Sequence, residues 1–144
     1  MIHRLIYISD ICEGYSTDLN KALDGARSFY AEHNITGALW FDGHHFIQLL
    51  EGPKEELAEA IEKRLLSDQP KCNVHVSDLQ KAKERLFPDW TMSYLCKGSY
   101  AHEVACQFIG NKEFDPHACH DQALMELICA LEHERQERAR DAIN

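Results

Sequence analysis

The pattern of apolar and polar positions divides the first part of the chain into strands and one helix. Residues 2–8 are mostly β-branched, aromatic or otherwise apolar, which predicts a strand. Small and apolar residues then recur at helical spacing from Asp18 to about residue 34, which predicts an amphipathic helix. The apolar runs 35–41 and 45–50 are separated by an Asp-Gly turn sequence, so we expect them to pair as an antiparallel hairpin.

The following segment predicts a second helix and two more strands. The helix is expected to begin at Pro53, because proline suits the first helical position and Glu55 and Glu56 suit the positive end of the helix dipole. Apolar residues within 74–79 and 90–96 indicate the strands. The order β-α-β-β-α-β-β predicts an α+β fold of ferredoxin-like type, with a mixed five-stranded sheet and two helices on one face.

The last third of the chain is predicted to be helical. Residues 100–108 and 121–140 carry the pattern of two helices, and the second one ends in a stretch that is polar on every side. We therefore divide the chain into a sheet domain, residues 1–97, and a C-terminal helical extension, residues 98–144, that is not an independent domain.

Composition narrows the possible functions. The chain has 144 residues and a formal net charge of −9, which opposes binding to nucleic acids and to anionic membranes. No apolar run approaches the roughly 20 residues of a membrane helix, and the N-terminus lacks a signal-peptide pattern, so we expect a cytoplasmic protein. The six cysteines are scattered without a Cys-x-x-Cys pair, which predicts free thiols.

Strand parity identifies the first candidates for a functional site. Alternate residues of a strand share a face, so Gln48 lies between two apolar neighbours on its face of the third predicted strand. A buried amide needs partners for its donors and its acceptor. If the faces of the first, third and last strands coincide, Tyr7, Gln48, Trp90 and Met92 converge beneath the two helices.

Five segments that include these residues resemble, in order, the signatures of BLUF domains, the blue-light sensors that use FAD. The segments are His-Arg-Leu-Ile-Tyr at 3–7, Ile-Thr-Gly at 35–37, Phe-Asp-Gly at 41–43, Phe-Ile-Gln-Leu-Leu-Glu-Gly at 46–52 and Arg-Leu-Phe-Pro-Asp-Trp-Thr-Met at 85–92. The resemblance covers about two thirds of the chain and implies the same fold. It also implies a short photoreceptor without enzymatic activity that binds FAD non-covalently, with FMN or riboflavin as alternatives.

The resemblance assigns roles to the converging residues. Tyr7 would donate an electron and then a proton to the excited flavin, and Gln48 would bridge the phenol and the ring and rearrange its hydrogen bonds. Met92, which also contacts the flavin, and Trp90 would relay the change to the helical extension and to a downstream signalling protein. Both relay residues also suit plain core packing. We further expect a homo-oligomer.

Two positions depart from the family pattern. Tyr30 stands where the family usually has an asparagine that binds the flavin ring, and its place on the helix directs it toward the pocket. Lys71 follows Asp68-Gln69-Pro70, where the family commonly has a basic pair at the phosphate end of the flavin. Tyr30 and Lys71 are therefore the expected cofactor contacts at these places. Tyr30 and Pro70 also motivate a second hypothesis, a light-independent interaction module whose flavin binding is weakened or lost.

Two other kinds of site are disfavoured. The sequence His-Ala-Cys-His at 117–120 contains possible metal ligands, but no second set with ligand spacing accompanies it, so no metal site is predicted. A small ferredoxin-like enzyme of the acylphosphatase kind would need an arginine-bearing, glycine-rich phosphate loop after the first strand, and none is present.

Overall fold

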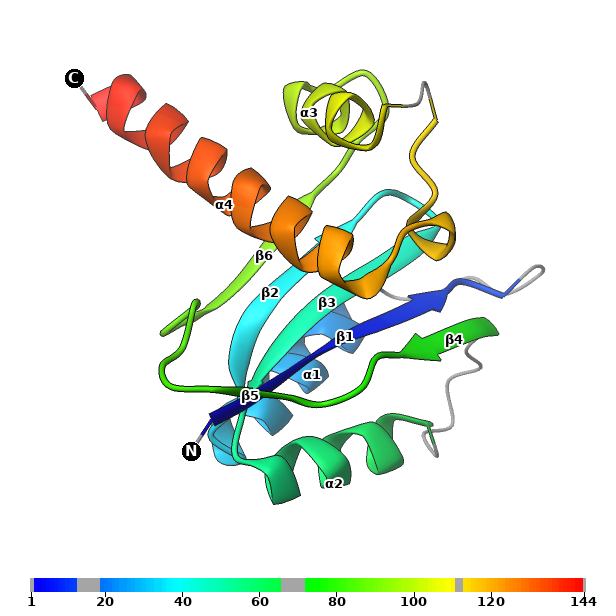
Figure 1. Ribbon diagram of the computed structural model, residues 1–144, viewed down its shortest axis with the longest axis vertical. Helices are drawn as coiled ribbons and strands as arrows, with labels where there is room; N and C mark the ends of the chain where they lie inside the picture. The colour runs from blue at the N-terminus through cyan, green and yellow to red at the C-terminus, as the bar shows by residue number, and fades with distance from the viewer. Residues whose placement is uncertain (1, 13–18, 66–71, 111–112, 144) are drawn as a thin grey trace.

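The structure is a computed structural model that describes residues 2–12, 19–65, 72–110 and 113–143 (Figure 1). In chain order the elements are β1 Ile2–Asp10, α1 Leu19–Glu32, β2 Thr36–Phe41, β3 His45–Gly52, α2 Lys54–Leu65, β4 Cys72–Val76, β5 Gln80–Ala82, β6 Trp90–Tyr94, α3 Tyr100–Ile109, the 3-10 turn η1 Pro116–Ala118 and α4 Asp121–Ile143. No helix in the described ranges is both long enough and apolar enough to span a bilayer.

The sheet confirms the predicted mixed topology. Its strand order is β4-β1-β3-β2-β6, and β5 pairs separately with β1. Strands β2 and β3 form the predicted antiparallel hairpin, whereas β6 lies parallel to β2 on the sheet's edge. The α+β ferredoxin-like prediction is therefore confirmed.

One strand was not predicted. Because β4 pairs with the C-terminal half of β1, the N-terminal half of β1 offers open hydrogen-bonding groups, and residues 80–82 pair with them. Two of the three β5 residues are exposed, so this strand has no apolar face that a hydrophobicity pattern could reveal. The fourth strand also begins earlier than predicted, at Cys72.

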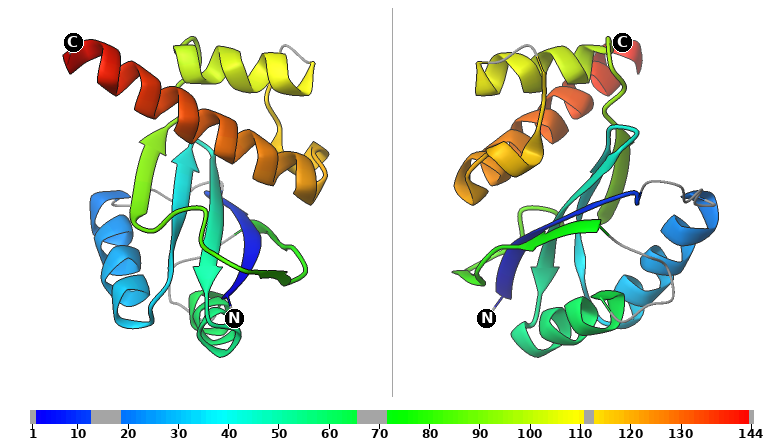
Figure 2. Two further views of the ribbon diagram at one scale, coloured as in Figure 1. Left: turned by 60° about the vertical axis from the view of Figure 1, so that its left-hand side comes forward. Right: turned by 90° about the vertical axis from the view of Figure 1, so that its right-hand side faces the viewer.

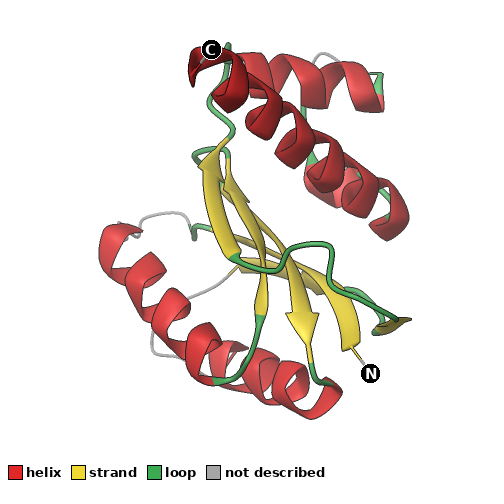
Figure 3. Cartoon of the chain, turned by 90° about the vertical axis from the view of Figure 1, so that its left-hand side faces the viewer, coloured by secondary structure: helices red, strands yellow, loops and turns green. Residues whose placement is uncertain are grey.

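Helices cover both faces of the sheet (Figures 2 and 3). One face packs against α1 and α2 around a buried cluster of Leu5, Tyr7, Ala26, Tyr30, Ile35, Leu50, Leu57 and Ala60. The other face carries Ile6, Ile8, Ala38, Trp40, Ile47 and Leu49, and it packs against α3 and α4. The helical extension therefore completes the core on the face that α1 and α2 leave open.

The prediction that all six cysteines are free thiols is wrong. Cys12 and Cys72 form a disulfide with a Cα–Cα distance of 5.3 Å, and the other four cysteines are free. Asp10 at the end of β1 pairs with Cys72 at the start of β4, which brings Cys12 close to Cys72. The two cysteines are 60 residues apart, so only the strand pairing brings them together.

A buried carboxylate holds the segment that precedes β6. Glu51 at the end of β3 is completely buried, and its Oε2 accepts hydrogen bonds from Nε and Nη2 of Arg4 at 3.1 and 2.9 Å. Its Oε1 accepts the backbone N–H groups of Leu86 and Phe87 at 2.9 and 2.8 Å. Arg85 adds bonds to the backbone oxygens of Glu51 and Asn34. These bonds fix the 84–87 segment against the sheet and so set where β6 begins.

We predict that Glu51→Gln lowers the free energy of unfolding by about 2–4 kcal/mol, because the amide turns one donor toward groups that are themselves donors. Urea unfolding of the full chain measures the change. Glu59→Gln is the matched control, because Glu59 pairs with Lys63 at an exposed position on α2. Loss of that exposed ion pair should not measurably change the free energy of unfolding. Equal stability of the two variants would contradict the role of Glu51.

Candidate functional site

Strand register places the candidate residues in one row. Tyr7 lies opposite Gln48, Gln48 lies opposite Leu39, and Leu39 lies opposite Met92. Directly opposed residues project from the same face, so the row crosses β1, β3, β2 and β6 on the face that α1 and α2 cover. Trp90 lies on the same face, opposite Gly37. The shared face expected from strand parity is therefore present.

The candidate side chains differ in burial. Tyr7 is 1% exposed and Gln48 is 3% exposed, although both carry polar groups. Trp90 and Met92 lie at the edge strand and are half-buried. Polar groups at the centre of a face that otherwise packs apolar side chains need specific partners. A ligand with its own hydrogen-bonding edge would suit this part of the face.

Tyr30 joins the row from α1. Its hydroxyl donates a hydrogen bond to Gln48 Oε1 at 3.0 Å, and its side chain is buried. Its ring centroid lies 4.9 Å from that of Trp90, with the planes tilted by 52°. Tyr30 therefore contacts both Gln48 and Trp90. The sequence predicted only that this side chain points inward, because a contact between a helix and a sheet depends on how they pack.

An indole group provides a further hydrogen-bond donor. Trp90 Nε1 is buried and has no hydrogen-bond partner among the residues that the structure describes. An unmatched buried N–H group is unfavourable unless a ligand or water accepts from it. This donor, the Gln48 amide and the phenol of Tyr7 lie on one face.

Lys71, the cation expected at the phosphate end of a flavin, lies outside the described residues, as do Asp68, Gln69 and Pro70. Its predicted role is therefore untested. The structure describes the other end of the candidate site, which is formed by Tyr7, Tyr30, Gln48, Trp90 and Met92.

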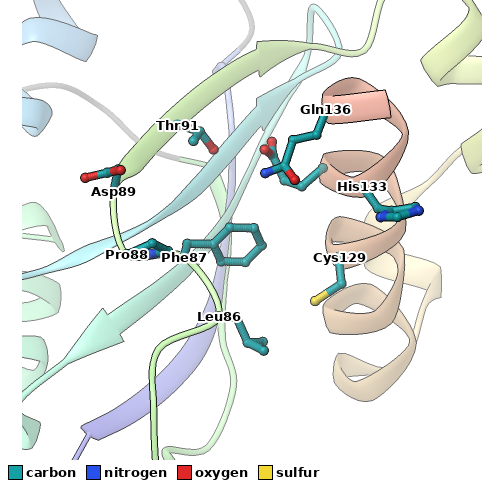
Figure 4. A pocket seen from close by; sticks show the side chains of 9 residues that line it. Leu86, Phe87, Pro88, Asp89, Thr91, Cys129, His133 and Gln136 are labelled. Carbon is teal, nitrogen blue, oxygen red and sulfur yellow. The ribbon is translucent and has the colours of Figure 1, made fainter. Parts of the chain in front are cut away.

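The opposite side of β6 borders a cavity. Its volume is about 280 Å³, and it lies between residues 86–89 with Thr91 and the face of α4 that carries Cys129 and His133 (Figure 4). Thr91 lies between Trp90 and Met92 in sequence but lines this cavity, because neighbouring strand residues point to opposite faces. Strand β6 thus connects the candidate site with α4.

Comparison with known proteins gives the family. The sequence profile described as "BLUF: Sensors of blue-light using FAD" matches residues 2–93, well over half of the chain. This chain belongs to the BLUF family. No curated protein sequence matches it.

Solved BLUF proteins share the fold over most of the chain. The structure titled "BlsA photo-activated state" is 26% identical, has a TM-score of 0.77, and is matched over 91% of this chain and 94% of its own length. The BlsA ground state is 28% identical with a TM-score of 0.74, over 91% of this chain and 87% of that one. Klebsiella pneumoniae BlrP1, described with FMN and cyclic diGMP, is 26% identical with a TM-score of 0.58, over 66% of this chain and 26% of BlrP1.

The described residues fit the ring of the flavin that BLUF domains use. An isoalloxazine ring presents acceptors and an N–H donor along one edge and apolar surface elsewhere. The buried Gln48 amide offers both donor and acceptor atoms, and the Trp90 N–H group needs an acceptor. Tyr7 and Met92 complete the same face. These residues would hold the ring end of a flavin.

We predict that Tyr30→Phe lowers the free energy of unfolding by about 1–3 kcal/mol, because the buried Gln48 carbonyl loses the hydroxyl that donates to it. Urea unfolding again measures the change. Tyr94→Phe is the matched control, since Tyr94 is 56% exposed on β6 and its hydroxyl can be replaced without burying an unmatched group. A Tyr30→Phe variant as stable as the control would show that the Tyr30–Gln48 bond contributes nothing.

Proposed function

We propose that this chain is a blue-light receptor that holds a flavin non-covalently on the face between the sheet and helices α1 and α2. The observation that carries the proposal is the row of Tyr7 and Gln48, buried side by side on that face of a BLUF chain. FAD is the flavin named for the family, and the BlrP1 structure described with FMN makes FMN the first alternative.

Tyr7 is the proposed electron and proton donor. When bound, the flavin supplies absorption of blue light and an acceptor for an electron. A phenol can give up an electron together with its proton, and Tyr7 is kept from bulk water by its burial. Gln48 lies directly opposite Tyr7 in the antiparallel pairing of β1 and β3, so we expect a change in the charge or protonation of Tyr7 to affect Gln48.

Gln48 is the proposed switch. An amide carries a donor and an acceptor on one group, and rotation or tautomerisation exchanges their positions. In the present arrangement the Gln48 carbonyl accepts from Tyr30. If the amide turns, its NH₂ group faces the Tyr30 hydroxyl, and that hydroxyl must then accept instead of donating. Tyr30 would therefore respond to the state of Gln48.

Strand β6 and helix α4 are the proposed output. The ring contact between Tyr30 and Trp90 brings the switch to the start of β6. The next residue, Thr91, faces the cavity beside α4, so a small shift of β6 alters the packing of the extension. Trp90 and Met92 would act as the relay, and the signal would pass to a protein partner without any reaction catalysed by this chain.

A second candidate function is favoured by Tyr30 itself. Its hydroxyl bonds Gln48 Oε1, the acceptor of the proposed switch, and its aromatic side chain is larger than the asparagine expected there. If that side chain excludes the ring, the chain is a light-independent interaction module with the BLUF fold. A colourless protein after expression with excess FAD would support this second function, and recovery of flavin by Tyr30→Asn would identify the cause.

For the first function, we predict that Tyr7→Phe keeps the flavin but loses the reversible red shift that blue light produces in its absorption. The ring of phenylalanine preserves the packing, but it cannot donate the electron and proton. Absorption spectra before and after illumination of the purified variant, taken beside the parent chain and Tyr94→Phe, measure the effect. A Tyr7→Phe variant with the full shift of the parent would contradict the role of Tyr7.

A further inference from the structure

A cluster of histidines surrounds a buried carboxylate at the far end of β1. Asp10 is the last residue of β1, and its side chain is 2% exposed. His44 and His45 reach it from the β2–β3 turn and the start of β3, and His117 reaches it from η1. These ligand-type residues come from three segments that are far apart in sequence. Residues so far apart show no regular ligand spacing along the chain.

The imidazoles present equivalent atoms to the carboxylate. Nε2 of His117 lies 2.9 Å from Asp10 Oδ1, and Nε2 of His45 lies 3.9 Å from the same oxygen. Nε2 of His44 lies 3.8 Å from Asp10 Oδ2. Ligand atoms around a tetrahedral ion with bonds of about 2.0–2.1 Å are separated by roughly 3.3 Å. One ligand atom each of Asp10, His44 and His45 lies within 4.8 Å of the other two, so these three residues suit one ion after small side-chain adjustments. His117 contacts Asp10 but lies outside that group of three, so its imidazole must turn toward the two turn histidines to become the fourth ligand.

One of the histidines is already oriented as metal ligands usually are. Nδ1 of His45 lies 2.7 Å from Asp42 Oδ2, so the Asp42 carboxylate can fix the tautomer that leaves Nε2 to face Asp10. The other Asp42 oxygen accepts the backbone N–H groups of His44 and His45 at 2.9 and 2.6 Å, which holds the turn that carries both imidazoles. Carboxylate support of this kind is a regular feature of histidine metal sites.

We propose that Asp10, His44, His45 and His117 bind a first-row divalent cation, with zinc as the representative ion. Three imidazole nitrogens and one carboxylate oxygen form a four-coordinate donor set that zinc accepts, and cobalt, nickel and copper share this preference for imidazole. The sulfurs of Cys12 and Cys72 are joined in a disulfide beside the cluster and are not part of the donor set.

The charge of the surroundings favours a cation. Burial raises the pKa of the Asp10 carboxyl, but hydrogen bonds with His117 and Asn73 and the nearby His45 outweigh burial, so the pKa lies below its ordinary value. Asp42 and Asp115 add carboxylates near His45, at 2.7 and 4.0 Å, in a chain of net charge −9.

A bound ion would join the extension to the sheet. Asp10 continues the strand that carries Tyr7, the two turn histidines adjoin β2 and β3, and His117 lies shortly before α4. The ion would therefore tie η1, and with it the start of α4, to one end of the sheet. This inference concerns residues outside the flavin face and does not depend on flavin binding.

Another group of possible ligands provides an internal comparison. His33, Glu56 and Glu59 also lie within reach of one ion, but Glu59 is paired with Lys63 at 2.8 Å and the pair is exposed. A lysine ammonium group there competes with a cation. We therefore expect the Asp10 cluster, and not this group, to bind zinc.

Isothermal titration of zinc into the metal-free full chain, with the disulfide kept oxidised, tests the proposal. We expect one ion per chain, and His45→Ala and His117→Gln should each weaken binding at least tenfold. His33→Ala and His75→Ala are the controls, since exposed His75 pairs with Asp121 and not with Asp10, and both variants should bind zinc as the parent does. Melting curves without zinc establish that every variant is folded.

Zinc X-ray absorption of the loaded chain identifies the ligands. We expect nitrogen and oxygen neighbours at about 2.0–2.1 Å and no sulfur at about 2.3 Å. The proposal is overturned by any one of three results: no saturable binding, binding that survives in His45→Ala and His117→Gln but is lost in His33→Ala, or a sulfur neighbour of the metal.

Discussion

The register of four neighbouring strands is the constraint on which the candidate site depends. Tyr7, Gln48, Leu39 and Met92 share a row only because β1, β3, β2 and β6 pair as they do. A slip of one residue in a strand moves all its side chains to the opposite face. Such a slip in β3 would carry Gln48 away from Tyr7 and Tyr30. The buried Glu51 bonds oppose this change, because they connect β1, β3 and the segment before β6.

The two faces of the sheet pack against different helices and bury different residues. One face buries Tyr7 and Gln48 among apolar side chains under α1 and α2, and the other buries apolar residues under α3 and α4. Strand β6 contributes to both, with Trp90 and Met92 toward the first face and Thr91 toward the cavity beside α4. In a closely packed interior, a displacement of side chains on one face of a strand also displaces the side chains packed on its other face. In the proposed mechanism, a change of hydrogen bonds at Gln48 would reach the extension through β6.

Local patterns in the sequence predicted the fold and three members of the row, Tyr7, Gln48 and Met92. Period-two alternation placed Tyr7 and Gln48 on inward faces, and the Asp-Gly turn predicted the β2–β3 hairpin that the structure contains. Strand β5 escaped prediction because its residues face solvent and pair only through their backbone. The Cys12–Cys72 disulfide, the Tyr30–Gln48 bond and the contact of His117 with Asp10 join residues that only the folded chain brings together.

We propose that the row of Tyr7 and Gln48 makes this BLUF chain sensitive to light. Visible absorption of the purified chain, loaded with FAD and recorded in the dark, after blue light and again after a dark interval, tests it most directly. We expect flavin absorbance that shifts slightly to the red on illumination and returns in the dark. A chain that binds FAD and whose spectrum stays unchanged under blue light would contradict it.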